Sequence, residues 1–186
     1  MKYLKIALRH AMELYKKALK YKNVVQLSNI KWKWWQQRQM KKHLNILGEC
    51  GEHIDIIITM CAFTFEAFIN FYAIIHHLDQ QPGYNERDST RKKWKKYLGQ
   101  VTHNQPDDMF LNRIQNIMDD RNNIGHYKAR RNGTTYDEYS MEDALRNLNE
   151  VYQIFQDCKV YDPNINLPYN KFDIPVYAKA ISMGYR

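Results

Sequence analysis

The chain has 186 residues, of which 44% are hydrophobic and 26% charged, a length and balance that predict one globular domain rather than a disordered chain. Its three cysteines are an odd and widely spaced set, which argues against a secreted disulfide framework and favours a reducing, cytoplasmic environment. The formal net charge of +8 permits a polyanionic partner but does not require one.

The N-terminal segment predicts a helix over residues 1–22, because its apolar residues recur at three- and four-residue spacing. These residues are Leu4, Leu8, Ala11, Tyr15 and Ala18. Its apolar run is broken by Arg9 and His10, too early for a signal-peptide core, so we expect no leader. Residues 23–47 predict a second helix, which Gly48 and Gly51 are expected to end.

The third expected helix, over residues 52–78, is the strongest candidate for the core. One face carries Cys61, Phe65, Phe68, Tyr72 and Ile75, and the other carries Ala62, Glu66, Ile69 and Ala73. The stretch from Ile54 to Ile75 is apolar enough to raise the question of a membrane span. It contains Asp55 and Glu66, however, and an acid at a bilayer centre costs about 2.5–3.5 kcal/mol. We therefore expect the central helix of a soluble bundle and no membrane partner.

Three shorter helices complete the expected bundle. Ser89 or Thr90 is expected to cap a basic helix that ends before Gly99, and Pro106-Asp107-Asp108 has the composition of the next helix start. From there Phe110, Ile114, Ile117, Arg121 and Ile124 form one stripe, so an arginine occupies an apolar position. Asn132-Gly133 predicts a turn, and Ser140 with Asp143 resembles a capping box before Ala144, Leu148, Val151 and Phe155.

These patterns predict an all-α fold, a helical bundle of about five to six helices with no sheet. We expect one domain over residues 1–160 and an irregular C-terminal arm over 161–186, which carries three prolines.

The segment Arg121-Asn122-Asn123-Ile124-Gly125-His126 carries the most chemistry in the sequence. On a helix Asn122 and His126 share a face, and Arg121 lies beside them. A histidine moves protons near neutral pH, and an arginine offers a forked, permanent charge to phosphate oxygens. The asparagine is suited to orienting the imidazole or holding a phosphate oxygen. Together these groups suffice to cleave RNA through its own 2′-hydroxyl.

The pattern Arg121-Asn122-x-x-x-His126 resembles the signature of HEPN domains. Two further segments are similar to that family: Phe65-Glu66-Ala67-Phe68-Ile69-Asn70 and the basic-Trp step Lys93-Trp94. The likeness covers residues 52–155. It implies a bundle that forms a two-fold homodimer with the signature helices facing each other. It also implies metal-independent endoribonuclease activity, with an antitoxin or phage-defence protein as a further partner.

The resemblance implies a set of site residues. Arg121, Asn122 and His126 are the expected catalytic residues, with Glu66, Asn70 and Tyr127 supporting them. Lys128, Arg130 and Arg131 follow directly and are expected to contact RNA phosphates. In a toxin branch of the family a tyrosine stands two residues after the histidine; here Tyr127 follows at once and position 128 is Lys128, so that branch's antitoxin mechanism is not assigned.

Other interpretations of these residues stay open. Arg121 and Glu66 are also explained as a structural pair of charges that neutralise each other, and His126 as a helix-end residue. The run Lys31-Trp32-Lys33-Trp34-Trp35 suits stacking on single-stranded RNA, although we favour packing. Cys50 with His53, or His76 with His77, lacks a second pair at metal-binding spacing, so we expect no metal and no cofactor. The alternative function is a non-catalytic HEPN-like module that binds RNA or protein.

Overall fold

The computed structural model describes residues 2–13, 35–127, 139 and 141–165. Within these ranges the fold is all-α: five helices pack as a bundle, and the same residues contain no strand. Residues 2–13 form the first helix. It is followed by α2 (Trp35–Ile75), the 3-10 turn η1 (Leu78–Gln80), α3 (Thr90–Thr102), α4 (Asp108–Tyr127) and α5 (Met141–Tyr161).

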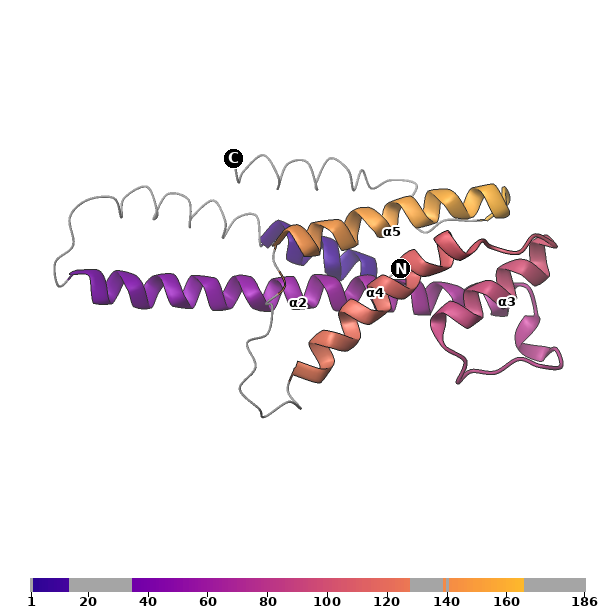
Figure 1. Cartoon of the computed structure of the whole chain (residues 1–186), viewed down its shortest axis with the longest axis horizontal. Coiled ribbons are helices and arrows are strands. Elements are labelled where there is room, and N and C mark those ends of the chain that lie inside the picture. The colour runs from indigo at the N-terminus through magenta and orange to yellow at the C-terminus, as the bar shows by residue number, and fades with distance from the viewer. Residues whose placement is uncertain (1, 14–34, 128–138, 140, 166–186) are drawn as a thin grey trace.

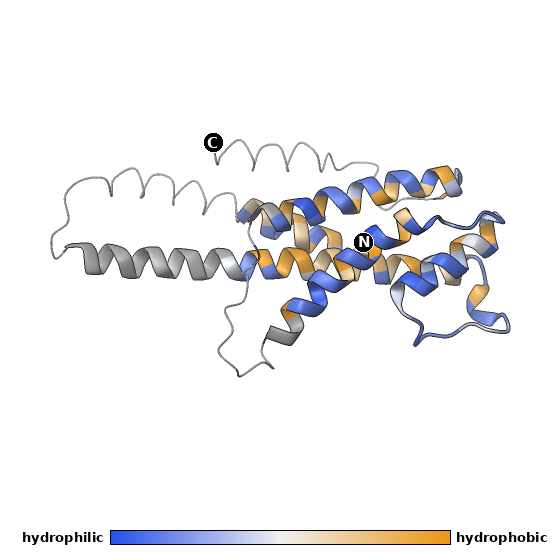
Figure 2. Cartoon of the chain, viewed as in Figure 1, coloured by the Kyte–Doolittle hydropathy of each residue, from blue (hydrophilic) through white to orange (hydrophobic). Residues whose placement is uncertain are grey.

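The long helix α2 organises the bundle, and α3, α4 and α5 all pack against its second half (Figure 1). Helix α5 runs alongside α2 in the same direction, whereas α4 crosses α2 obliquely in the opposite direction (Figure 1). Hydrophobic residues concentrate along the part of α2 that the other helices surround (Figure 2). Rings from three helices meet there: Phe65 of α2 stacks on Phe155 of α5 at 5.3 Å and meets the edge of Trp94 of α3 at 6.0 Å.

The expected break between two helices at Gly48 and Gly51 is wrong, because α2 continues through both glycines without interruption. A glycine inside a helix costs only about 1 kcal/mol relative to alanine, so a glycine alone does not end a helix. The same reason applies to Gly99, where α3 was expected to stop: the helix continues to Thr102.

The end of α2 also differs from the prediction. The helix ends at Ile75 rather than at residue 78, because His77 adopts a left-handed conformation with φ of 55° before η1 begins. Ile75 is exposed, whereas the other predicted core residues of this helix, Cys61, Phe65, Phe68 and Tyr72, are buried. The opposite face is buried as well at Ala62, Ile69 and Ala73.

The predicted helix starts of α3 and α4 are confirmed. The Ser89 hydroxyl accepts a hydrogen bond from the backbone N–H of Lys92, and the Asp107 carboxylate accepts one from the backbone N–H of Phe110 at 2.7 Å. The stripe of α5 is confirmed as well, since Ala144, Leu148, Val151 and Phe155 are all buried. The predicted turn at Asn132-Gly133, the capping Ser140, the tryptophans at 32 and 34 and most of the C-terminal arm lie outside the described residues.

One segment of the described residues, Gly51–Ile75 of α2, is long and apolar enough to span a membrane by length and composition alone. Half of its most apolar window is buried inside the bundle. The core helix of a soluble protein has the same length and composition, so the segment is weak evidence for a membrane span.

Candidate active site

The helix α4 places Arg121 at the edge of the core. Phe110, Ile114 and Ile117 of the same stripe are buried, and Ile124 packs partly against the core. Arg121 continues this stripe but is only partly covered, with 27% of its side chain exposed. The guanidinium carbon lies 5.7 Å from the centre of the Phe63 ring on α2, so an aromatic face covers one side of the charge.

Glu66 of α2 is the ionic partner of Arg121, and this contact confirms the prediction that the two charges pair. The Nη1 atom of Arg121 donates to Oε2 of Glu66 at 3.4 Å. The Glu66 side chain is 39% exposed, so the pair sits at the rim of the bundle and not in its dry interior. The fully buried pair that the sequence suggested is therefore not present. The carboxylate limits how far the guanidinium can turn, and water still reaches both groups.

Asn122 completes the contacts of the arginine. Its Oδ1 atom accepts hydrogen bonds from Nη2 of Arg121 at 2.9 Å and from Nε at 3.3 Å. From the sequence, Asn122 was expected to orient the imidazole of His126 or to hold a phosphate oxygen. In the structure its side-chain oxygen accepts hydrogen bonds from the Arg121 guanidinium instead. Glu66 and Asn122 together hold the arginine fork from two sides.

His126 and Tyr127 belong to the last turn of α4, where the structure describes the backbone but not their side chains. Because α4 is helical through Tyr127, His126 stands one turn beyond Asn122 on the same side of the helix. The three basic residues assigned to RNA, Lys128, Arg130 and Arg131, lie outside the described residues.

Asn70 does not join the arginine. It lies one turn after Glu66 on α2, and its Oδ1 atom accepts a hydrogen bond from Nζ of Lys93 at 2.9 Å. Lys93 is 4% exposed, so this ammonium group depends on the asparagine for its contact with α2. The resemblance placed both segments near the site; the structure shows that Lys93 and Asn70 form a polar link between α2 and α3.

A polar network between α4 and α5 was missed from the sequence. Asp120, next to Arg121 in the chain, accepts hydrogen bonds from Nδ2 of Asn147 at 2.9 Å and from the Tyr139 hydroxyl at 3.1 Å, and pairs with Arg146 at 3.5 Å. Tyr139 also accepts a hydrogen bond from Asn123. Burial, helped by the Asp120 charge, raises the pKa of the Tyr139 hydroxyl above its ordinary value. The sequence held one signal for this network: Asn147 is a polar residue among the apolar positions of α5, and the structure buries it.

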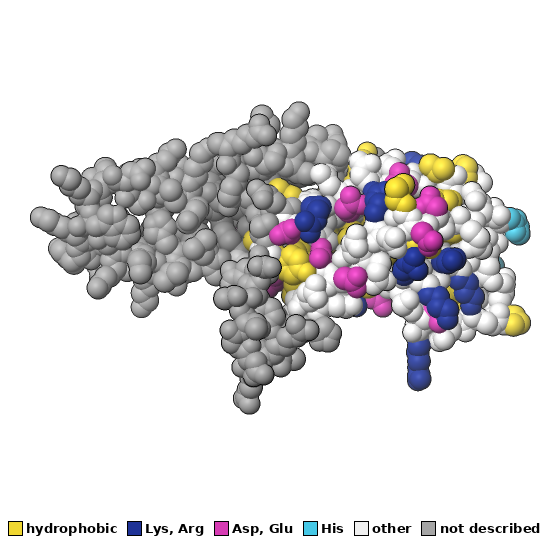
Figure 3. Space-filling model, in the orientation of Figure 1, with side chains coloured by type: hydrophobic (Ala, Val, Ile, Leu, Met, Phe, Trp, Pro, Cys, Tyr) yellow, Lys and Arg dark blue, Asp and Glu magenta, His cyan; other side chains and the backbone are white. Residues whose placement is uncertain are grey.

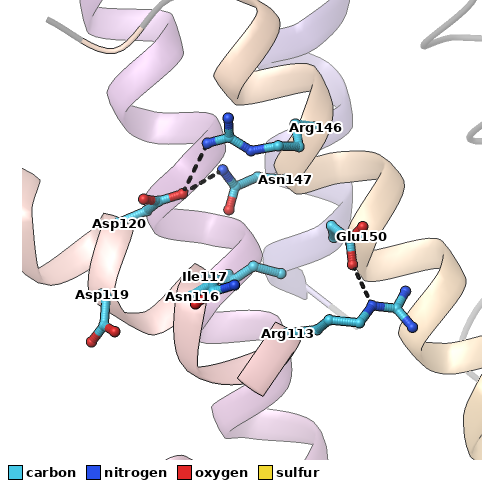
Figure 4. A pocket seen from close by; sticks show the side chains of 8 residues that line it. All are labelled: Arg113, Asn116, Ile117, Asp119, Asp120, Arg146, Asn147 and Glu150. Atoms are coloured by element: carbon cyan, nitrogen blue, oxygen red, sulfur yellow. Dashed lines mark hydrogen bonds and ion pairs between the residues drawn. The ribbon is translucent and has the colours of Figure 1, made fainter. Parts of the chain in front are cut away.

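This network borders a hollow of about 350 Å³ between α4 and α5 (Figure 4). Its lining alternates in charge: Arg113 pairs with Glu150 at 2.7 Å, and Arg146 pairs with Asp120 (Figure 4). The network fixes the end of α4 against α5 and so holds the segment that begins at Arg121 in place. The cations here are neutralised locally, which makes the hollow a poor phosphate site.

The surface charges follow the same local pairing. Lys and Arg side chains gather over α3, and acidic side chains are interspersed with basic ones over α4 and α5 (Figure 3). On α3, Lys92 pairs with Asp88 at 2.7 Å and Arg91 with Asp108 at 3.1 Å. Local acids therefore offset part of the positive charge on α3.

Comparisons with protein-family models, with curated proteins and with solved structures find no significant match for this chain.

Proposed function

We propose that the protein is a cytoplasmic, metal-independent endoribonuclease of the HEPN type that acts on single-stranded or loop RNA. The observation that carries the proposal is the arrangement of Arg121. An arginine interrupts an apolar stripe, is held from two sides by Glu66 and Asn122, and lies at the end of α4 that leads into His126. A fork held in this way is suited to the equatorial oxygens of a phosphate.

The proposed reaction uses the RNA as its own nucleophile. His126 takes the proton of the 2′-hydroxyl, and the 2′-oxygen attacks the adjacent phosphorus. The bond to the 5′-oxygen breaks, that oxygen gains a proton, and a 2′,3′-cyclic phosphate remains. Arg121 stabilises the negative charge that develops on the phosphate during the attack.

A two-fold homodimer supplies the second proton carrier. One chain offers a single histidine in the signature, whereas the reaction uses both a proton acceptor and a proton donor. An isologous interface that brings two α4 helices together provides the second His126 as the donor. Lys128, Arg130 and Arg131 follow the site in the chain and are proposed to hold flanking phosphates. An antitoxin or phage-defence protein is the proposed regulator.

The test is RNA cleavage in the presence of chelator, at a temperature below the unfolding midpoint measured in the same buffer. Wild type and the variants His126→Ala, Arg121→Ala and Asn122→Ala are incubated with labelled RNA and with DNA of the same sequence. Loss of a positioned general base commonly lowers the rate by about 10²–10⁴-fold, so His126→Ala should be nearly inactive. Arg121→Ala should be similarly impaired and Asn122→Ala less so.

The matched control is His76→Ala, because His76 is an exposed histidine that directly follows the last residue of α2. It should cleave RNA like the wild type. Equal cleavage by wild type and His126→Ala would mean that another group or a contaminant is responsible. Cleavage of DNA would rule out the mechanism, since DNA lacks the 2′-hydroxyl.

A non-catalytic module that binds RNA or protein is the second candidate. It is favoured by the same contacts, because Glu66 and Asn122 already occupy part of the hydrogen-bonding capacity of Arg121. A purified protein that binds RNA but leaves every tested RNA intact would select this function.

A further inference from the structure

Helix α3 differs from its neighbours in the sign of its charge. It carries five cations and no acid, whereas α4 and α5 together carry four cations and seven acids. The positive charge of these three helices is therefore concentrated on α3, and Figure 3 shows dark-blue side chains gathered over it. The five cations are Arg91, Lys92, Lys93, Lys95 and Lys96.

The cations of α3 other than Lys93 lie on one side of the helix. Lys95 stands four residues after Arg91, and Lys96 stands four residues after Lys92, so the members of each pair are neighbours on the helix surface. The opposite side of α3 is buried at Lys93, Trp94, Tyr97 and Leu98. Like charges at this spacing repel, and Arg91 and Lys92 also lie in the first turn, at the positive end of the helix dipole. Both arrangements disfavour the helix, and a bound anion offsets both.

Neighbouring acids leave much of this charge open to a partner. Lys92 pairs with Asp88, but the Lys92 side chain is 65% exposed and that of Asp88 only 7%, so the cation and not the acid reaches the surface. Arg87 and Lys95 are exposed, and neither side chain forms an ion pair or a hydrogen bond with a residue that the structure describes. We call the following residues together the basic face: Arg87, Arg91, Lys92, Lys95 and Lys96.

The composition of the basic face favours a nucleic-acid backbone over a membrane surface. A helix that lies on a bilayer needs apolar side chains to insert below the headgroups. The large apolar side chains of α3 point into the core, and none of the exposed large hydrophobic residues in the described part of the chain belongs to α3. A phosphate backbone, in contrast, is held by cations alone.

We propose that the basic face binds the phosphates of single-stranded RNA and forms a docking surface separate from the cleavage site. That the polyanion is RNA rests on the proposed function. Arg91 pairs with Asp108, the first residue of α4, and Arg121 lies about 20 Å further along that helix, since a helix rises about 1.5 Å per residue. The basic face therefore holds phosphates remote from the bond that breaks, and these contacts add affinity without sequence preference.

The experiment measures binding without cleavage. The probe is a fluorescent 2′-O-methyl RNA of about 20 nucleotides, longer than common single-strand site sizes and without a free 2′-hydroxyl. Fluorescence anisotropy of the full chain is recorded over a range of salt concentrations. The triple variant Arg87→Gln/Lys92→Gln/Lys95→Gln should bind roughly 100-fold more weakly at about 0.1 M salt. The slope of log K against log salt should fall by about 2, because each phosphate contact with a single strand contributes about 0.7.

The matched control removes the same charge from the first helix. Lys2, Lys5 and Arg9 are exposed there, and their triple glutamine variant has the same net charge as the first triple variant. It should keep most of the wild-type affinity and slope. A third variant, Arg87→Lys/Lys92→Arg/Lys95→Arg, preserves the charge of the basic face and should bind like the wild type. Circular dichroism checks that all three variants are folded.

Three results would overturn the proposal. The wild type binds no RNA even at low salt, both glutamine variants lose affinity equally, or the basic face instead carries binding to vesicles of equal parts phosphatidylcholine and phosphatidylserine. DNA of the same sequence should bind much like the RNA probe, since phosphate contacts do not use the 2′-hydroxyl.

Cleavage of unmodified RNA separates this proposal from the proposed function. If the protein cleaves RNA, loss of the basic face should raise KM for a long RNA and leave kcat unchanged, because the removed contacts are the same in the ground and transition states. A trinucleotide is too short to reach both places, so its kcat/KM should not change. RNA that binds through the basic face and stays intact would contradict the ribonuclease function and leave the docking surface in place.

Discussion

The Nη1 atom of Arg121 lies 3.4 Å from Oε2 of Glu66, and this contact ties α4 to α2 at the edge of the core. Both side chains are partly exposed, so water screens the attraction and lowers its contribution to stability. The pair therefore matters more for the direction of the guanidinium than for the free energy of unfolding. Function and stability should respond differently when the pair is broken.

Glu66→Gln tests this difference. The amide keeps the shape but removes the charge, so we expect the free energy of unfolding to fall by no more than about 1 kcal/mol. If the protein cleaves RNA, the rate should fall more than stability does, because Arg121 loses one of its two anchors. Urea unfolding and RNA cleavage measure the two effects, with the exposed Glu52→Gln on the same helix as control. A loss of several kcal/mol would show that the pair is part of the sealed core.

Gly51→Ala should stabilise the protein. Gly51 lies inside α2, and a Cβ atom added there meets nothing within 4 Å. Alanine is favoured over glycine in a helix by about 0.5–1 kcal/mol, so the free energy of unfolding should rise by that amount. The measurement is chemical denaturation followed by circular dichroism. A decrease would mean that this stretch of α2 is not a continuous helix in solution.

The periodicity of the sequence predicted most of the described bundle, but not the length of its elements. Apolar residues at spacings of three and four predicted α5 and the core of α2, and the structure buries most of these residues. Polar residues before α3 and α4 predicted where these two helices start. Helices α2 and α3 both continue through glycines that were predicted to end a helix. Whether a helix ends at a glycine depends on the packing of the residues beyond it, which local sequence does not contain.

Only part of the candidate site was predicted, because contacts between helices depend on how the helices cross. A charge on an apolar stripe requires a partner, and that rule identified Glu66 for Arg121. The links from Asp120 to Asn147 and from Lys93 to Asn70 join residues that are far apart in the chain. Their pairing follows from how the helices cross, so spacing along one helix could not indicate it.

Tyr72 makes the protein sensitive to alkaline pH. Its hydroxyl donates to Oδ2 of Asp162 at 2.9 Å, and both residues are buried. Burial first, and then the hydrogen bond to Asp162, raise the pKa of Tyr72 above its ordinary value of 10.0. The folded state therefore keeps its proton when the unfolded state has lost it. Stability from this group is complete below pH 10.0 and declines as the pH rises above it.

Tyr72→Phe should lower the free energy of unfolding by about 1–3 kcal/mol at neutral pH, because one oxygen of the buried Asp162 loses its donor. The variant should also lose part of the decline above pH 10.0, since phenylalanine has no proton to release. Urea unfolding on both sides of that pH measures both effects. An unchanged alkaline slope in the variant would show that Tyr72 titrates normally in the folded protein.

The last prediction concerns Lys93, a buried residue of α3 whose ammonium group donates to Oδ1 of Asn70 on α2 at 2.9 Å. Asn70→Ala removes this acceptor, and an ionised donor left without a partner costs about 1–3 kcal/mol or more.

Lys93→Met replaces the charge by an apolar chain of similar length and should change stability little, since exchanging a buried charge for a hydrophobic residue is often neutral. In the double variant the lost acceptor no longer matters, so the effect of Asn70→Ala should shrink towards that of the exposed control Asn149→Ala. Urea unfolding of the wild type, both single variants and the double variant gives the coupling free energy between the two side chains. Additive effects would mean that Lys93 reaches water and does not depend on Asn70.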